Sequence, residues 1–149
     1  IDRATLVSVL EESFRNVIAK TFGSDENYDV IVNPDKGDFE IRRNRVVVED
    51  DKHPVMKGVS RTTVIPDDEF YIYDKSPRGR VRILATVDED SYTTETDIKM
   101  GDHPVVWTNE DVKGRNLYIQ MGHSPKLLEN PDFTQMLRNA IDWVLKNNR

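Results

Sequence analysis

The spacing of apolar residues predicts an amphipathic helix at the start of the chain. These residues recur every three or four positions, which is the period of one helix face. They are Leu6, Leu10, Phe14, Val17 and Ile18. Asp2 can cap the first turn, and Gly23 can end the helix because glycine readily adopts left-handed backbone angles.

Beyond the helix, the pattern changes to short runs of β-forming residues. Residues 28–32 and 39–42 flank a turn-forming segment and predict a hairpin, which residues 46–48 extend or follow as a third strand. Further strands are predicted at 62–65, 70–73 and 81–87. The strand at 81–87 is the most apolar and is therefore expected at the centre of the sheet. The polar residues 88–101 predict a long loop.

Residues 103–125 combine a strand pattern, a turn and a candidate reactive side chain. Residues 105–108 and 117–121 are rich in β-branched, aliphatic and aromatic residues and flank a polar segment, so they predict a hairpin. Gly122 and Pro125 stop the second strand around His123. Open α/β sheets hold ligands at the carboxyl ends of their strands, which makes His123 the best candidate for chemistry.

A second amphipathic helix is predicted at the end of the chain. Asn130 can cap it, with Pro131 in the first helical position. Its apolar stripe comprises Phe133, Met136, Leu137, Ala140, Ile141, Val144 and Leu145, and Trp143 lies beside the stripe. Together the elements predict an α+β fold, in which one mixed β-sheet carries the N-terminal and the C-terminal helix.

Composition narrows the class of protein. The chain has 149 residues, no cysteine and a formal net charge of -6. It therefore has no disulfide, thiolate nucleophile or Cys-bound zinc, and its acidic balance argues against direct nucleic-acid binding. Because no long apolar run or signal peptide is present, we expect a protein without membrane contact that is either cytoplasmic or already processed, and the lack of cysteine favours the cytoplasm. The first residue is Ile1 rather than Met, so a fragment of a longer protein is expected.

The first third of the chain resembles a transcription factor. Residues 1–50 contain IDRATLVSVLEESFRNVIAKTFG and NYDVIVNPDKGDFEIRRNRVVVED, which are similar to the start of the NusA N-terminal domain. No GxxG loop of a KH module follows. The resemblance implies contact with RNA polymerase, for which Arg42, Arg43 and Arg45 are the candidate residues. The alternative is that these arginines solvate a strand edge.

A second resemblance covers residues 52–147. The motifs HPVMKGV, DDEFYIYD, VRILATV, HPVVW, KGRNLYIQMGHSP and PDFTQMLRNAIDWV follow the pattern of the ThuA-like (trehalose utilisation) family, whose fold resembles that of class I glutamine amidotransferases. The leading βα units of that family are missing. We therefore expect a natural or engineered chimera of two parts, 1–50 and 52–149, joined between Val48 and His53.

The second resemblance also implies a candidate site. His123 in GHSP is similar to the base of the amidotransferase triad, whose cysteine is absent here, and no GxSxG elbow offers a serine instead. We therefore expect no catalytic residue and no cofactor, and a vestigial or ligand-binding His123 near Trp107, Glu69 and Ser124. Glu69 has the alternative of a plain surface carboxylate. The three histidines lack the spacing of HExxH, so no metal is expected.

Two functions remain open at this point. The first is a ThuA-like module that binds a sugar or sugar derivative, with Trp107 stacking on a pyranose ring and polar groups near His123 taking hydroxyls. The second is an RNA polymerase-binding module of transcription elongation or termination. A recombinant that folds without function is the third outcome. Exposed sheet edges also favour a homodimer.

Overall fold

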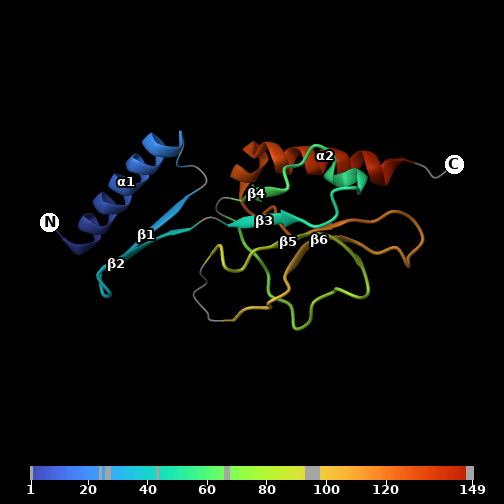
Figure 1. Cartoon of the computed structure of the whole chain (residues 1–149), viewed down its shortest axis with the longest axis horizontal. Coiled ribbons are helices and arrows are strands. Elements are labelled where there is room, and N and C mark those ends of the chain that lie inside the picture. The colour runs from blue at the N-terminus through green and yellow to red at the C-terminus, as the bar shows by residue number, and fades with distance from the viewer. Residues whose placement is uncertain are drawn as a thin grey trace. The chain divides into compact units, whose positions relative to one another are not determined.

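The computed structural model describes residues 2–23, 25, 28–42, 44–65, 68–92 and 98–146. The chain folds into two compact units, Ile1–Arg43 and Asn44–Arg149 (Figure 1). None of the described helices is both long and apolar enough to cross a lipid bilayer.

The first unit is the predicted helix followed by the predicted hairpin. Helix α1 (Arg3–Phe22) is capped by Asp2, whose side chain accepts a hydrogen bond from Thr5 N at 2.9 Å, and it ends at Gly23 with a φ of 86°. Strands β1 (Asp29–Asn33) and β2 (Asp38–Arg42) pair antiparallel. Both predictions are confirmed, because short-range capping and turn residues determine these elements.

The packed face of α1 differs from the predicted stripe. Ile18 is buried, and the ring of Phe14 stacks on Phe39 of β2 with 4.2 Å between centroids. Leu6, Leu10 and Val17 belong to the same predicted stripe but are exposed. A stripe of that width exceeds what a two-stranded hairpin can cover.

The second unit contains a five-stranded sheet in the order β4-β3-β5-β6-β7. All four pairings are antiparallel, where a mixed sheet was expected. Parallel neighbours are usually joined by a crossover helix, whereas α1 precedes all the strands of this chain and α2 follows them. The α+β class is confirmed, as is the central position of β5. The strands are β3 (Arg45–Val48), β4 (Thr62–Val64), β5 (Arg82–Val87), β6 (Pro104–Thr108) and β7 (Tyr118–Ile119).

Helix α2 (Pro131–Leu145) packs beside the short helix η1 (Pro54–Met56) (Figure 1). Asn130 caps α2 as predicted, accepting from Phe133 N at 3.0 Å, and its amide nitrogen donates to Val64 O at 2.9 Å. The cap therefore also ties the helix to β4. The buried face of α2 consists of Phe133, Met136 and Ala140, whereas Ile141, Val144 and Leu145 of the predicted stripe are exposed.

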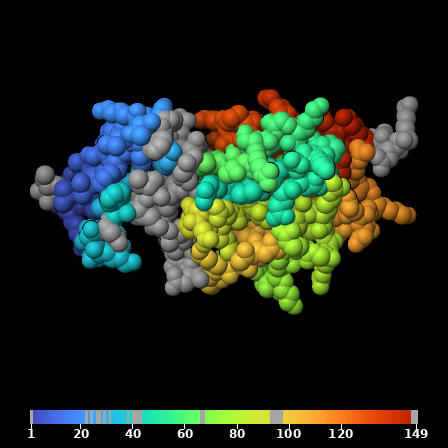
Figure 2. Space-filling model, viewed as in Figure 1, coloured from blue at the N-terminus to red at the C-terminus, as the bar shows by residue number. Residues whose placement is uncertain are grey.

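The tip of the β6-β7 hairpin lies against the last turn of α2 (Figure 2). Arg115 donates to the carbonyl oxygens of Trp143 and Lys146, at 2.8 and 3.0 Å. Trp143 itself contacts the His53 ring edge-on, with 4.7 Å between centroids. The prediction that Trp143 packs at the edge of the core is confirmed.

Candidate functional site

Residues 68–73 run beside residues 118–124, the segment that begins with the edge strand β7. We call this pair of segments the seam. The predicted strand at 70–73 is wrong, because its backbone groups bond to side chains instead of a strand ladder. The Tyr71 carbonyl oxygen accepts from Gln120 Nε2 at 2.7 Å and from His103 Nε2 at 3.0 Å. Tyr73 N donates to the Met100 sulfur at 3.4 Å. The segment thus covers the sheet edge without extending the sheet.

At one end of the seam, the Asp68 carboxylate binds three consecutive backbone N–H groups. Gly122 N donates to Oδ2 at 2.8 Å, while His123 N and Ser124 N donate to Oδ1 at 2.9 and 3.3 Å. Gly122 has a φ of 136°, a conformation that glycine adopts without strain. Backbone N–H groups that converge on one carboxylate form charge-assisted bonds, so Asp68 fixes the position of the loop.

The side chains of Glu69 and His123 project from this fixed loop and its partner segment. Glu69 Oε1 lies 3.8 Å from His123 Nε2, and the two side chains are 56% and 65% exposed. Ser124 is buried, and its carbonyl accepts from Leu127 N in the short helix η2 (Pro125–Glu129). The structure therefore brings three of the four predicted ligand-binding residues together, with the two polar side chains facing solvent.

Trp107, the fourth predicted residue, lies at the other end of the seam. Its ring stacks on Tyr118 with 4.0 Å between centroids and 18° between planes, and Tyr73 meets it edge-on at 5.8 Å. The hydroxyls of Tyr73 and Tyr118 are 3.0 Å apart. Sequence patterns missed both tyrosines, because alternation around a strand does not show which ring contacts which.

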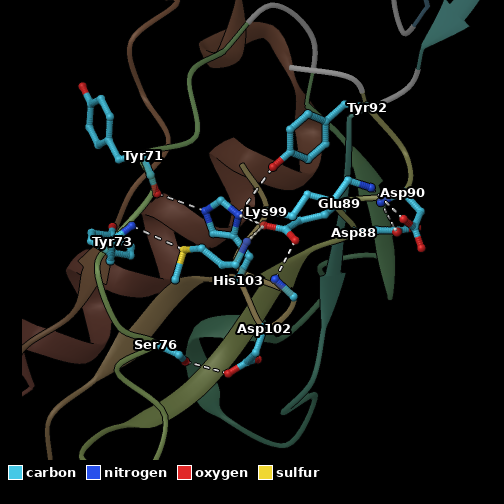
Figure 3. A network of polar contacts seen from close by, with 12 residues as sticks. Tyr71, Tyr73, Ser76, Asp88, Glu89, Asp90, Tyr92, Lys99, Asp102 and His103 are labelled. Carbon is cyan, nitrogen blue, oxygen red and sulfur yellow. Dashed lines mark hydrogen bonds and ion pairs between the residues drawn. The ribbon is translucent and has the colours of Figure 1, made fainter. Parts of the chain in front are cut away.

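A buried polar network lies between the two ends (Figure 3). His103 Nδ1 is 2.9 Å from Glu89 Oε1, and both ring nitrogens face acceptors, since Nε2 bonds to the Tyr71 carbonyl. Burial acts to raise the pKa of Glu89, but the N–H groups of Met100 and Gly101, both at 2.8 Å, and the imidazole together lower it. The pair therefore joins the residues just after β5 to those just before β6.

Sequence patterns did not predict this pair. Glu89 and His103 are 14 residues apart, and only His103 belongs to a family motif, HPVVW, which does not indicate its partner. Because both side chains are almost fully buried and bonded to backbone groups, the pair holds the loop and the seam together and does not face a ligand.

The three arginines predicted to contact RNA polymerase are described only in part. Arg45 forms an ion pair with Asp88 at 2.7 Å, and its backbone N donates to Ser91 Oγ at 2.9 Å. Arg42 is the last residue of β2, and Arg43 lies outside the described residues. Arg45 is thus part of the contacts that hold β3 beside the start of the 88–101 loop.

No group of three or more His, Asp or Glu side chains in the described part of the chain could hold a metal ion. The candidate site is therefore the seam, with an imidazole and a carboxylate at one end and stacked aromatic rings at the other.

Comparisons with known proteins place the chain in a family. The family model described as "ThuA: Trehalose utilisation" matches residues 12–144. The crystal structure of a ThuA-like protein from Bacteroides uniformis is similar, with 27% sequence identity and a TM-score of 0.63. The similarity covers 72% of this chain and 45% of that one, so the chain spans less than half of that relative. No curated protein matches the chain.

The family match corrects one expectation from the sequence. It begins at residue 12 and runs through the expected join between Val48 and His53. None of the comparisons supports a NusA segment or a fusion of two fragments. A capped helix followed by a polar hairpin is a local pattern that unrelated proteins share, which explains why residues 1–50 resembled a second family.

Proposed function

Because the chain belongs to the trehalose utilisation (ThuA) family, we propose that it is a sugar-binding module of that family and performs no hydrolysis itself. The observation that carries this proposal is the exposed pair of His123 and Glu69, whose ring nitrogen and carboxylate oxygen are 3.8 Å apart. Asp68 holds the loop beneath them through three backbone hydrogen bonds. The pair is therefore positioned before a ligand arrives, which reduces the entropy lost on binding.

The two side chains suit a polyhydroxylated ligand. A carboxylate accepts hydrogen bonds, whereas an imidazole can both donate and accept, and neighbouring sugar hydroxyls need this combination. Trp107 and Tyr118, further along the seam, supply the aromatic surface against which the apolar face of a pyranose packs. The family description names trehalose, so trehalose is the first ligand to test.

The same residues are poorly arranged for acyl transfer. The chain contains no cysteine, and Ser124, which follows His123 directly, is buried. A base without an accessible nucleophile lacks most of the advantage of a catalytic triad. Binding without turnover is the activity that this geometry supports.

The test is a titration with trehalose followed by NMR of the ¹⁵N-labelled chain. We expect the backbone amide signals of Gly122, His123 and Ser124 to shift with increasing sugar. His123→Ala and Glu69→Gln should each weaken binding roughly tenfold, the usual loss for a hydrogen bond to a charged group. Lys113→Ala, at the exposed tip of the β6-β7 hairpin, is the control and should bind like the parent chain. Unchanged spectra for trehalose and glucose would contradict the proposal.

A further inference from the structure

Tyr73, Trp107 and Tyr118 form a compact group of rings, here called the aromatic cluster. Trp107 lies between the other two, stacked on Tyr118 and in edge contact with Tyr73. Tyr118 is 38% exposed, so the cluster is open to solvent on the side of that ring. A ring that is held on one side and exposed on the other offers a rigid surface for stacking.

Gln120 determines the direction of the hydrogen bonds in this cluster. Its Nε2 donates to the Tyr71 carbonyl at 2.7 Å, and this acceptor has no proton to give, so the orientation of the amide is fixed. The second Nε2 proton points to Tyr73 Oη at 2.9 Å. Tyr73 Oη therefore accepts from Gln120, and its own proton is free for Tyr118 Oη at 3.0 Å.

This arrangement leaves one buried atom unsatisfied. Gln120 is 8% exposed, and its Oε1 has no hydrogen-bond partner among the described residues. An unpaired buried acceptor is unfavourable, and such groups in native proteins call for an explanation. The geometry offers one explanation. If the amide were reversed, its oxygen would face the Tyr71 carbonyl oxygen, so Nε2 must keep its place, and in this place it makes Tyr73 a donor to Tyr118.

The consequence is a defined role for Tyr118. Since Tyr118 Oη accepts from Tyr73, its proton is directed away from the cluster, toward an acceptor outside the protein. Burial, followed by the hydrogen bond with Tyr118, raises the pKa of Tyr73 above its usual value of 10.0, so the Tyr73 hydroxyl keeps the proton that it donates. Chains of hydrogen bonds polarise one another, which strengthens the final donor.

We propose that the aromatic cluster is a stacking subsite for a pyranose ring, to which Tyr118 Oη donates a hydrogen bond. A flat apolar face with oxygens at its rim is the ligand chemistry that a stacked ring with a hydroxyl donor at its edge recognises. The inference rests on the proposed sugar-binding function and adds the donor that orients the stacked ring, Tyr118 Oη, together with the residues that set its direction.

The two tryptophans of the chain allow a direct test. Trp107 is in the cluster, whereas Trp143 packs against His53 and serves as the internal reference. On titration with trehalose, the indole N–H signal of Trp107 should move and that of Trp143 should not. Tyr118→Phe keeps the ring but removes the donor, so the affinity should fall roughly threefold to tenfold, as for loss of one neutral hydrogen bond.

The control is Lys113→Ala, at the exposed tip of the β6-β7 hairpin and outside the seam. This variant should bind like the parent chain. Tyr73→Phe keeps the Tyr118 donor but removes the hydrogen bond that orients it, so it should weaken binding less than Tyr118→Phe does. It provides a second variant should Tyr118→Phe fold poorly.

The outcomes separate the two proposals. If trehalose shifts the amides of residues 122–124 while the Trp107 indole signal stays fixed, the sugar-binding function stands and the stacking subsite is overturned. Equal affinities of Tyr118→Phe and the parent chain would also overturn the subsite. If no signal responds to trehalose or glucose, both proposals fail together.

Discussion

Asp68 and His123 are 55 positions apart in the sequence, yet the Asp68 carboxylate accepts the His123 backbone N–H at 2.9 Å. The same carboxylate binds the neighbouring N–H groups of Gly122 and Ser124. The side chain that was predicted to carry the chemistry is therefore positioned through its backbone by a carboxylate one residue before Glu69. This relationship explains how an irregular segment at a sheet edge keeps two exposed polar side chains together.

Replacing Asp68 by asparagine should loosen this loop. An amide has one acceptor oxygen, and its NH₂ group would face backbone donors, so at least one N–H loses its partner. We expect the free energy of unfolding to fall by about 1–3 kcal/mol, measured by urea denaturation. Amide hydrogen exchange of residues 122–124 should also accelerate.

The control for this substitution is Asp111→Asn, which makes the same chemical change at the exposed hairpin tip. It should leave stability within about 0.5 kcal/mol of the parent chain. Equal effects of the two substitutions would show that the three hydrogen bonds to Asp68 contribute nothing to the loop.

The local elements of the fold were predictable, and the seam was not. Asp2, Gly23 and Asn130 act on residues within one helical turn, so both ends of α1 and the start of α2 followed from the sequence. The backbone of Tyr71, by contrast, is bonded to Gln120, which is 49 positions away, and to His103, which is 32 positions away. A period-two pattern at 70–73 cannot show that distant side chains have replaced a strand partner.

The candidate site was likewise predictable only in part. His123 and Glu69 were predicted from motifs of a family, and the structure brings them together. Trp107 was predicted beside them, but it contacts Tyr73 and Tyr118 instead. Its position depends on the register between β6 and β7, in which Trp107 is opposite Tyr118. Such a register is set by tertiary packing and is not visible in a single run of sequence.

Breaking the buried pair of His103 and Glu89 should have a large effect on stability. His103→Leu removes the imidazole contacts with the Glu89 carboxylate, the Tyr71 carbonyl and the Tyr92 hydroxyl. Leaving a buried polar group without its partner typically costs about 1–3 kcal/mol, and more for a charged group. Chemical denaturation of this variant should show a loss in that range.

His123→Ala provides the comparison for that experiment, since the His123 side chain is exposed and its backbone bond to Asp68 is retained. Its stability should change by less than about 0.5 kcal/mol. A His103→Leu chain as stable as His123→Ala would contradict the structural role of the buried network.

Stability should also depend on pH through His53. Burial lowers the pKa of His53 below its usual value of 6.5, with the charge of Arg82 acting in the same direction and Asp50 and Glu110 opposing it. Its Nδ1 accepts a hydrogen bond from Val55 N at 3.3 Å, which only the unprotonated nitrogen can do. The unfolded chain therefore binds the proton first as the pH falls. This contribution to stability is complete above pH 6.5 and declines below it.

The measurement compares urea unfolding of the parent chain and His53→Gln between pH 8 and pH 5. The stability advantage of the parent over the variant should shrink on the acid side, by at most about 1.4 kcal/mol per pH unit. The lowered pKa values of Glu89 and Asp102, which do not depend on His53, affect both chains alike at lower pH. A difference that stays constant over this range would show that His53 is not held in its neutral form.

The last prediction is that the chain does not hydrolyse amides, esters or glycosides. Members of a catalytic triad act as a unit, and losing one lowers the rate by on the order of 10⁴-fold. Here the cysteine is absent and Ser124 is buried, so His123 has no nucleophile to activate at its own loop. In assays with glutamine, p-nitrophenyl acetate and trehalose, the parent chain and His123→Ala should both show only the rate of hydrolysis seen in buffer alone. The two chains should differ only in their affinity for the sugar. A turnover by the parent chain that disappears in His123→Ala would show that His123 works with a nucleophile outside this geometry, and the module would then be an enzyme.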